Sequence, residues 1–363
     1  MCDDIARGLI NLVAISVLGL MIKQNALFSP KERRASLLAV ASVIVAIVAE
    51  AITFSLAAPN SPYWQINKLF CAIGFGITPF VPFLMAVAFG VRGGKNRILY
   101  AGPAIINALL SALSPFYGFI YSYSSANEYS RGPFFPVFIL ASLFGMVMFV
   151  VHTLAAVRVF QNRNKGILLG IVFLTLFGAS IQVIRTEIPS TWPTITLAMI
   201  LAYAYYTELL EQHDVMTKLF NRRAYEKRLA QLALKGAGCA VLFDVDNFKQ
   251  VNDSHGHQYG DLCLAKIAQC IRDSFGRFGF CYRIGGDEFG VLSARLDRRS
   301  LDRAVSAFEA EMAWLRAEDP CLPRVSMGHA FFGEGACGAE EALQAADRML
   351  YLSKKRKAEK VPI

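Results

Sequence analysis

Long apolar segments fill the first 210 residues of the chain. A helix that crosses a bilayer needs about 20 mostly apolar residues. Seven stretches approach that length: 5–22, 36–57, 67–91, 98–121, 134–158, 166–184 and 193–210. The first contains Arg7 and the last ends in the polar run YYTELL, so these two have the weakest boundaries. The pattern predicts an α-helical multi-pass membrane domain over residues 1–207, with about seven helices.

The pattern changes after residue 207 to alternating helical and strand periods. Helical periods cover 222–234, 260–275, 300–318 and 339–357, with Ser300 as the predicted N-cap of the third. Apolar strand-like runs cover 239–245, 280–284, 288–292 and 324–332. The order α-β-α-β-β-α-β-α is that of a split βαβ, ferredoxin-like plan. It predicts a palm-type α+β domain over residues 208–363.

The boundary between the two halves contains no segment rich in Gly, Pro or Ser. Residues 202–229 keep a helical pattern throughout, so the last span is expected to run directly into an amphipathic helix. A stiff connection of this kind transmits rotation or dimer geometry. Two interpretations stay open: a signalling helix, or a plain juxtamembrane helix.

Composition and charge support this division. The chain is 55% hydrophobic with a mean hydropathy of +0.40, which is too apolar for a soluble protein of 363 residues. Residues 1–210 carry 14 Lys and Arg against 7 Asp and Glu, whereas residues 211–363 carry 23 against 21. The net charge of +9 therefore reflects short basic loops in the apolar half, and no nucleic-acid partner is expected.

The loop charges predict the orientation of the membrane domain. Loops 23–34, 92–97 and 158–165 are basic, whereas loops 59–67, 122–132 and 185–192 are close to neutral. Basic loops stay in the cytoplasm. The alternation places the N-terminus outside and residues 208–363 inside, with an aromatic belt at the outer boundary formed by Tyr63, Trp64 and Trp192.

A few polar residues lie inside the predicted spans, namely Glu50, Asn107, His152 and Gln182. Such residues are costly in a bilayer and are candidates for function. They can also hydrogen-bond one helix to another. Whether Glu50 lines a ligand pocket or only joins helices is left open by the sequence. The eight cysteines contain no CxxC pair, which favours buried free thiols in a reducing compartment.

The chemistry of the second half centres on the stretch RIGGDEFGVL at 283–292. It predicts a tight hairpin in which Gly285 and Gly286 take positive φ and clear space for a ligand. Asp287 and Glu288 then project from the end of the hairpin.

A second acidic stretch, FDVDNFKQVNDSHGHQYGD, covers 243–261. Asp244 and Asp246 end a predicted buried strand, and residues two apart on a strand point the same way. An EF-hand does not fit, because its sixth and twelfth positions would be Lys249 and His255. Two carboxylates and a lysine instead suit a Mg²⁺–polyphosphate site.

Together these stretches resemble the GGDEF-domain diguanylate cyclases of bacteria. The resemblance covers roughly 208–363 and rests on DVMTKLFNRR (214–223), DVDNFKQVNDSHGHQYGD (244–261), RIGGDEFG (283–290) and ADRMLYLSKK (346–355). The resemblance implies condensation of two GTP into cyclic di-GMP with release of two pyrophosphates. It implies a homodimer that holds one GTP on each of two facing domains.

The resemblance also implies roles for individual residues. Metal ligands for Mg²⁺ (or Mn²⁺) would be Asp244, the carbonyl of Val245 and Asp287. Asp287 would also be the base for the 3′-hydroxyl, with Glu288 as a further metal contact and Lys249 steadying the phosphates. Positions that resemble the nucleotide-binding residues are Phe248, Asn252, His257, Asp261 and Lys354. Of these, Asn252 and Asp261 would read the guanine edge, which favours GTP over ATP.

Three departures from the family pattern stand out. The Arg-x-x-Asp of the family's inhibitory site is replaced by Gly276 and Gly279, so no product-inhibition site is expected. Lys218 stands where LTGL has glycine, so that turn is expected to be altered. The family ending Gly-Arg-Asn is replaced by KRKAEK, and its arginine falls on Ala358. Arg356 or Lys357 could substitute for it, or the basic run could be a solvated helix end or a contact with anionic lipid.

These observations predict a diguanylate cyclase of the bacterial cytoplasmic (inner) membrane, with its cyclase domain in the cytoplasm and membrane lipid around its helices. Its partners would be GTP, a second copy of the chain and downstream effectors of cyclic di-GMP. In this prediction, residues 1–207 are a membrane sensor domain that regulates the cyclase. The alternative is a catalytically silent domain that binds GTP or a partner and is coupled to this sensor domain.

Overall fold

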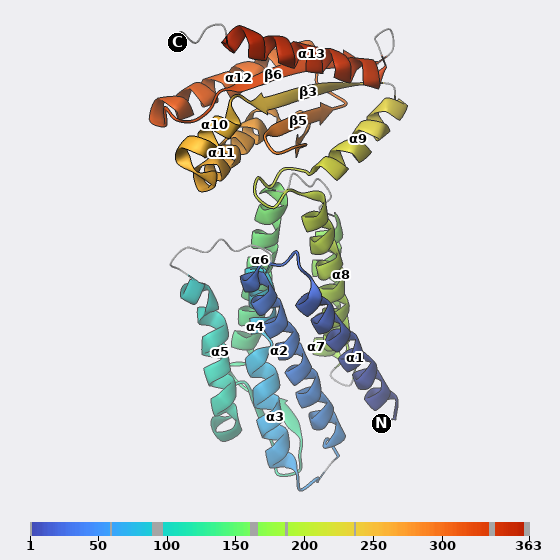
Figure 1. Ribbon diagram of the computed structural model, residues 1–363. Helices are drawn as coiled ribbons and strands as arrows, with labels where there is room; N and C mark the ends of the chain where they lie inside the picture. The colour runs from blue at the N-terminus through green and yellow to red at the C-terminus, as the bar shows by residue number, and fades with distance from the viewer. Residues whose placement is uncertain are drawn as a thin grey trace. The chain divides into compact units, whose positions relative to one another are not determined.

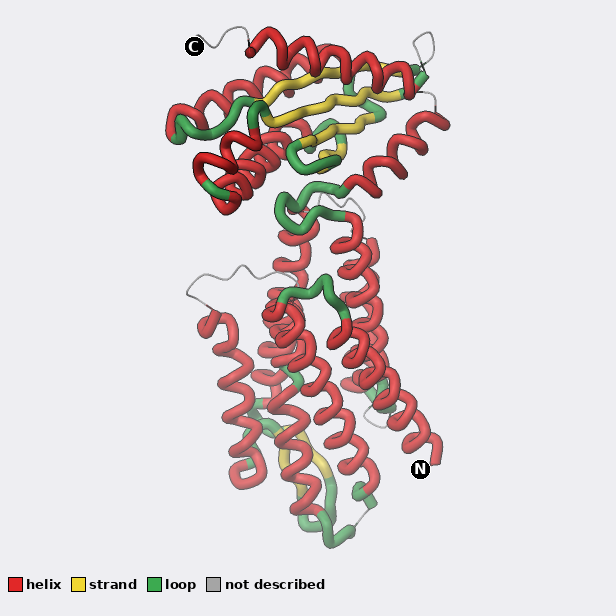
Figure 2. Tube along the Cα trace, in the orientation of Figure 1, coloured by secondary structure: helices red, strands yellow, loops and turns green. Residues whose placement is uncertain are grey.

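The computed structural model describes residues 2–58, 60–88, 97–159, 166–185, 188–235, 237–333 and 338–358. The chain forms two compact units, one ending at Glu208 and one beginning at Leu209. The first is helical with one small hairpin, and the second combines helices with a sheet (Figures 1 and 2). Loop 92–97 lies almost entirely, and loop 158–165 mostly, outside the described residues, as does the end of the predicted span 67–91.

The first unit is built from helices α1 to α8 and the hairpin of β1 (Tyr121–Tyr123) and β2 (Tyr129–Arg131). The helices are α1 (Cys2–Gln24), α2 (Pro30–Ser55), α3 (Trp64–Ile77), α4 (Phe80–Ala88), α5 (Arg97–Tyr117), α6 (Phe135–Val159), α7 (Gly166–Ile184) and α8 (Thr191–Gln212). Local sequence explains several of these boundaries. Ser29 and Glu32 form a capping box that starts α2 at Pro30. Pro79 follows the last turn of α3, and Gly118, with φ of 66°, follows α5.

Within the described residues, four helical segments are long and apolar enough to cross a membrane: Pro30–Ser55, Trp64–Ala88, Phe135–Ala155 and Gly166–Ile184. They indicate multi-pass membrane anchoring. The other three predicted spans fall on α1, α5 and α8, which are not among these four; the apolar part of α1, Gly8–Gln24, is shorter. The count of seven spans therefore stays a prediction.

Two residues of this unit, the aromatic Trp192 and the polar Asn107, are buried. Trp192, expected in an interfacial belt, is buried, with 5% of its surface exposed. Asn107 is fully buried, and its Nδ2 donates to the carbonyl of Phe75 at 2.7 Å. Asn107 thus joins α5 to α3, one of the two roles that the sequence left open.

The second unit contains α9 (Arg222–Lys235), α10 (Phe248–His255), α11 (His257–Phe275), α12 (Arg298–Glu318) and α13 (Ala339–Ala358). Its strands are β3 (Gly238–Val245), β4 (Phe280–Arg283), β5 (Glu288–Ser293) and β6 (Val325–Phe332). They form an antiparallel sheet in the order β4-β5-β3-β6. The domain is therefore α+β, as predicted, with the short α10 as an extra helix before α11.

Alternation along β3 explains why helices cover both faces of this sheet. Val241 and Phe243 pack into a core with α11 and α12, where Phe243 meets the rings of Phe275 and Phe308 at 5.4 and 5.3 Å. Ala240 belongs to the core on the opposite face, with residues of α9 and α13. Figure 1 shows α13 running along the sheet.

The connection between α8 and α9 differs from the expectation. The helical pattern of 202–229 predicts one continuous helix, but α8 ends at Gln212 and α9 begins at Arg222. Residues 213–221 form a turn in which Asp214 accepts from the N–H of Thr217 at 2.8 Å. A short acidic side chain that bonds the backbone locally offers an alternative to the helix.

Candidate active site

The end of β3 carries Asp244 on the face of the sheet that α13 covers. Side chains two apart on a strand point the same way, so Asp244 follows Ala240 and Leu242. The carboxylate is half-buried, and its Oδ1 lies 2.7 Å from Nζ of Lys354 on α13. The end of a buried strand therefore holds one carboxylate in a fixed place.

The hairpin between β4 and β5 brings two further carboxylates to this point. Glu288 is the cross-strand partner of Asp244 in the register of β3 and β5. The N–H of Val245 donates to the carbonyl oxygen of Asp287 at 3.2 Å. The backbone of Asp287 is thereby tied to the end of β3, so the two acidic stretches of the sequence meet.

The two glycines of the hairpin do not act as predicted. The described glycines with positive φ are Gly118, Gly256 and Gly333, so the expected positive φ at Gly285 and Gly286 is wrong. Four residues connect β4 to β5, which gives the chain room to turn without a left-handed residue. A Cβ at Gly285 would lie 2.5 Å from Oε2 of Glu288, whereas one at Gly286 would meet open space. Their contribution is the absence of a side chain.

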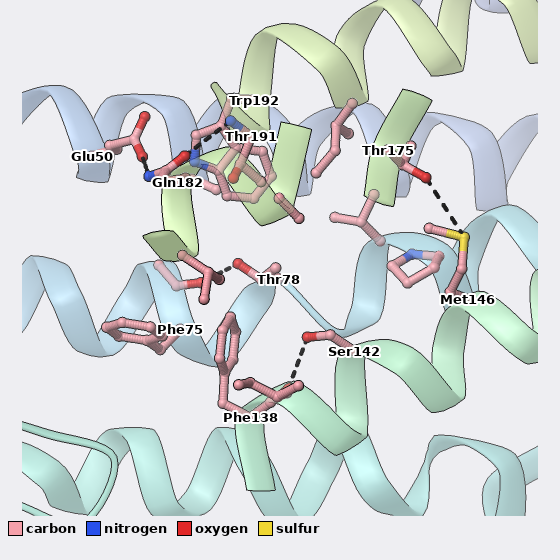
Figure 3. Close-up of a pocket in the computed structure, with 18 of the residues that line it drawn as sticks. Glu50, Phe75, Thr78, Phe138, Ser142, Met146, Thr175, Gln182, Thr191 and Trp192 are labelled. Carbon is pink, nitrogen blue, oxygen red and sulfur yellow. Dashed lines mark hydrogen bonds between the residues drawn. The ribbon is translucent and has the colours of Figure 1, made fainter. Parts of the chain in front are cut away.

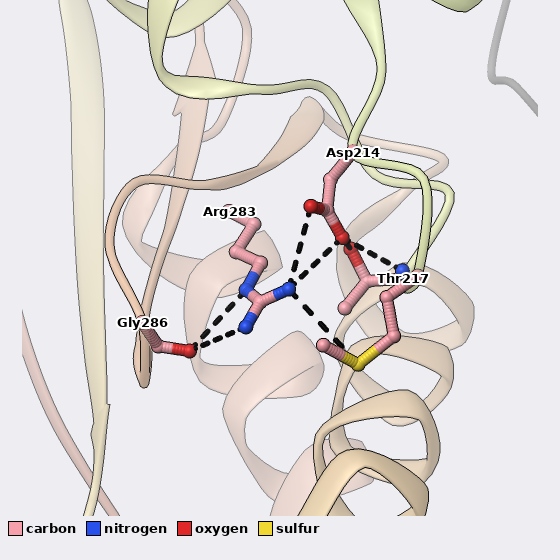
Figure 4. Close-up of polar contacts among 5 residues, drawn as sticks. Asp214, Thr217, Arg283 and Gly286 are labelled. Atoms are coloured by element: carbon pink, nitrogen blue, oxygen red, sulfur yellow. Dashed lines mark hydrogen bonds and ion pairs between the residues drawn. The ribbon is translucent and has the colours of Figure 1, made fainter. Parts of the chain in front are cut away.

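An ion pair fixes the hairpin from its other side (Figure 4). Nη2 of Arg283 donates to the carbonyl of Gly286 at 2.7 Å, and Nη1 lies 3.2 Å from Oδ1 of Asp214. The same Oδ1 accepts from the hydroxyl of Thr217 at 2.7 Å. Burial raises the pKa of Asp214, but the Thr217 donors and Arg283 outweigh burial and hold this pKa below its ordinary value. We call this pair the Asp214–Arg283 clamp; the sequence analysis did not identify it, although Arg283 directly precedes the motif.

The turn that carries the clamp contains Lys218 with φ of 60°. This left-handed conformation favours glycine, because a Cβ crowds the following carbonyl oxygen. The turn keeps the shape suited to glycine while the chain supplies a lysine. The lysine is therefore expected to make this turn less stable than glycine would, and a change in the shape of the turn stays a prediction.

Two lysines of α13 reach the acids at the end of β3. Lys354 pairs with Asp244, and Nζ of Lys357 lies 3.8 Å from Oδ2 of Asp246. Lys357 also donates to the carbonyl of Val325 at 2.5 Å. Burial lowers the pKa of Lys357, against the pull of Asp246. Of the two predicted substitutes for the family's arginine, Lys357 is the one that faces the acids, whereas Arg356 is exposed.

The electrostatics of Asp244 favour a cation at this place. Burial raises the pKa of Asp244, Lys354 opposes that rise, and the neighbouring Asp287 and Asp246 add to it. Two carboxylates and the Val245 carbonyl are hard oxygen ligands, which fits Mg²⁺ or Mn²⁺ completed by water and phosphate oxygens. In the described part of the chain, no group of three or more His, Cys, Asp or Glu side chains is spaced to hold a metal.

Of the predicted nucleotide-binding residues, all but Lys354 lie on α10 and α11. Phe248 opens α10, and Lys249 is exposed in its first turn. His257 and Asp261 are exposed near the start of α11. Within the described residues, no hydrogen bond or ion pair joins Lys249, His257 or Asp261 to the acids at the end of β3.

Asn252, on α10, is half-buried. Its Oδ1 is buried without a hydrogen-bond partner among the described residues. A Cβ at Gly260 would overlap this oxygen, so the glycine allows α11 to approach α10 here. Gly256, with φ of 82°, makes the turn between the two helices. An unpaired buried acceptor is costly, and a ligand donor would satisfy it.

The position of the absent inhibitory site is closed by packing. A Cβ at Gly279 would lie 2.8 Å from the carbonyl oxygen of Leu292. An aspartate does not fit here unless β4 or β5 shifts. Arg277, one residue out of register, lies over the ring of Phe278 at 4.5 Å.

Comparison with known proteins places this site in a family. The family model described as "Diguanylate cyclase, GGDEF domain" matches residues 211–360. The diguanylate cyclase DosC of Escherichia coli K12 is 34% identical over 160 residues, which cover 41% of this chain and 34% of DosC. The diguanylate cyclase TpbB of Pseudomonas aeruginosa UCBPP-PA14 is 31% identical over 282 residues, which cover 74% of this chain and 59% of TpbB. The chain thus spans less than two thirds of the length of these curated relatives.

A solved structure, the GGDEF domain of DgcB from Caulobacter crescentus in complex with c-di-GMP, is also similar. It is 28% identical, with a TM-score of 0.36, and the match covers 40% of this chain and 91% of that one.

Proposed function

Because this chain belongs to the GGDEF family of diguanylate cyclases through residues 211–360, we propose that it condenses two GTP into cyclic di-GMP and releases two pyrophosphates. The observation that carries the proposal is the meeting of Asp244, Asp287 and Glu288 at one end of the sheet, beside Lys354.

In this proposal, Asp244 and Asp287 bind the triphosphate through a metal ion, and Asp287 also prepares the nucleophile. Asp244, Asp287 and the Val245 carbonyl would hold Mg²⁺ or Mn²⁺, which would supply positive charge to the phosphates. Asp287 takes the proton from the 3′-hydroxyl that attacks the α-phosphorus of the other nucleotide. Glu288, exposed beside Asp244, adds a further oxygen ligand.

The lysines stabilise the charge that develops on the phosphates. Lys249 is exposed and free to turn toward a bound triphosphate. Lys354 pairs with Asp244, and its ammonium group would bind phosphate oxygens in place of this carboxylate when the nucleotide is bound. Both steps use a lysine as a point charge, as phosphate sites do.

Guanine is selected by Asn252 and Asp261. A carboxylate accepts from the N1–H and N2–H₂ of guanine, and adenine lacks that donor pair. The partnerless Oδ1 of Asn252 supports a donor from the base at this place. ATP would leave both acceptors unpaired, which disfavours it.

The membrane half anchors and regulates the cyclase in this proposal. We infer about seven spans, an outer N-terminus and a cytoplasmic domain beginning at about residue 208, from the apolar segments and loop charges. Each catalytic site needs two nucleotides, so the active form is a homodimer. Its location is the bacterial cytoplasmic membrane, and its product passes to cyclic di-GMP effectors.

The test uses the full chain in lipid nanodiscs with GTP or ATP and Mg²⁺, and mass spectrometry of the products. We expect cyclic di-GMP from GTP, no cyclic product from ATP, and loss of product with Asp287→Asn. Asp302→Asn, which removes an exposed carboxylate from α12, is the matched control and should keep full activity. Bound GTP without product would make the domain a silent GTP receptor and refute the proposal.

The packing at Gly279 gives a separate expectation for regulation. Since Gly276 and Gly279 replace the Arg and Asp of the family's inhibitory position, initial rates should not fall when micromolar cyclic di-GMP is added. Initial rates measured against product concentration check this, and strong inhibition would show that the chain binds product elsewhere.

A further inference from the structure

The helical unit contains a partly open cavity of about 750 Å³. Side chains from α2, α3, α4, α6, α7, α8 and the β1–β2 hairpin line it, and Figure 3 shows part of this lining. Aromatic and aliphatic groups such as Phe75, Phe138 and Trp192 dominate the walls. This volume lies in the range of sites that hold small molecules, 300–1,000 Å³ or so.

Four hydroxyls of the lining donate to backbone carbonyls of their own helices. The hydroxyls of Thr53, Thr78 and Ser142 each donate to the carbonyl four residues earlier, at 2.9, 2.7 and 2.9 Å. Thr175 donates to the carbonyl of Val172 at 2.8 Å. A hydroxyl bonded in this way has little left to offer a ligand as a donor, so these positions act as apolar surface.

A hydrogen bond between two polar side chains of the lining joins α7 to α2. Nε2 of Gln182 on α7 donates to Oε1 of Glu50 on α2 at 2.6 Å. Oε1 of Gln182 accepts from the N–H of Thr191, the first residue of α8, at 2.9 Å. Gln182 therefore uses both ends of its amide to hold the Glu50 carboxylate at the cavity wall. The sequence singled out both residues without placing them together.

The charges of the lining are unbalanced at Glu50. Glu50 and Arg131 are the charged side chains in the cavity wall. Arg131 donates to the carbonyl of Val183 at 2.8 Å and lies over the ring of Phe135 at 4.8 Å. Within the described residues, no lysine, arginine or histidine forms an ion pair with Glu50. A carboxylate in an apolar wall without a cation is costly, and a ligand that brings one would be bound strongly.

We propose that this cavity is a binding site for a small hydrophobic amine, whose protonated nitrogen pairs with Glu50 while its apolar body packs among the aromatic walls. The aromatic rings favour a cation as well as an apolar body. The amine is the signal that the membrane half senses; this sensing role rests on the proposed function.

The cavity contains its own reporter, because Trp192 lines it. The chain has three tryptophans, and Trp64→Phe with Trp314→Phe leaves Trp192 alone. This protein, in nanodiscs, is titrated with 4-phenylbutylamine, and Trp192 emission is recorded. We expect a saturable change, with the amine binding at least about tenfold more tightly than 4-phenylbutanol or 4-phenylbutyrate.

Two pairs of matched variants locate the site. Glu50→Gln should weaken binding of the amine about tenfold or more. Glu128→Gln, on the exposed turn of the hairpin, should not change binding. Gly74→Leu should abolish binding, because a side chain there enters open space within the cavity lining. Gly170→Leu, also in a helix and also facing open space, lies outside the lining and should have no effect.

The outcomes decide the proposal without any use of cyclase activity, so its failure and that of the proposed function are distinguishable. Equal binding of the amine and the alcohol would overturn the role of Glu50. Tighter binding of 4-phenylbutyrate would make Arg131 the anchor and the ligand an anion. An unchanged signal in Gly74→Leu would show that the probe dissolves in lipid, and the site would be rejected.

Discussion

Lys218 takes a backbone conformation suited to glycine, in the turn that also holds Asp214. In the left-handed region of φ and ψ, a residue with a Cβ is less stable than glycine by about 1 kcal/mol. The sequence points to this residue only through its departure from the LTGL pattern. The φ of 60° supplies the physical reason for that pattern.

Lys218→Gly should therefore stabilise the second unit by about 1 kcal/mol relative to Lys218→Ala. Both variants lose the lysine side chain, so their difference isolates the backbone. Trp314, the one tryptophan of residues 211–363, reports unfolding of this unit in urea. Equal stability of the two variants would contradict the argument.

Other residues show the same limit of sequence patterns. Neither Gly285 nor Gly286 has a positive φ; at Gly285 a Cβ would lie against Glu288, whereas at Gly286 it would meet open space. The spacing of the motif predicted a turn correctly but could not distinguish these two reasons for glycine.

At the scale of elements, the Asp214–Arg283 clamp joins the turn at 213–221 to the β4–β5 hairpin. Only 14% of the Arg283 side chain and 24% of the Asp214 side chain are exposed. Partly buried pairs of this kind contribute more than exposed ones. The clamp thus positions the loop that carries Asp287.

Arg283→Met should cost about 2 kcal/mol of stability at pH 7, because Asp214 loses a charged donor. The matched control is Arg222→Met, which breaks an exposed pair with Glu226 and should cost much less. Urea unfolding monitored at Trp314 measures both. Equal costs would show that the clamp adds nothing.

The difference in unfolding free energy between the parent and Arg283→Met depends on pH. The folded pKa of Asp214 is lowered, so the stability that its charge contributes is present above the unfolded value of about 3.9. This contribution is lost as the pH falls through the folded pKa. The gap between the parent and Arg283→Met should therefore narrow below about pH 4.

Helix boundaries also depend on local bonds that periodicity does not reveal. The helix predicted to begin at Ser300 begins at Arg298, because Asp297 is its N-cap and accepts from the N–H of Ser300 at 2.7 Å. Asp, Ser and Asn compete for such positions, and the geometry of the preceding loop selects one.

At the scale of the whole chain, the membrane orientation can be tested with native cysteines. Cys2 lies at the predicted outer end, and Cys321 is exposed on the second unit. Two variants that each keep one of these cysteines are treated with a membrane-impermeant maleimide in intact spheroplasts.

We expect labelling of Cys2 alone, and of Cys321 only after detergent is added. Protection of both before detergent would place the two ends on the same side and require an even number of spans. That result would refute the prediction of seven.

The sequence by itself determined the division into an apolar helical half and a charged α+β half, since hydropathy and strand alternation are local properties. It also named Asp244, Asp287, Glu50 and Gln182. Tertiary structure decided which of these meet: Asp244 with Lys354 and the hairpin, and Glu50 with Gln182 beside a cavity. Contacts between residues 40 to 130 positions apart follow from packing and strand register, which no local pattern encodes.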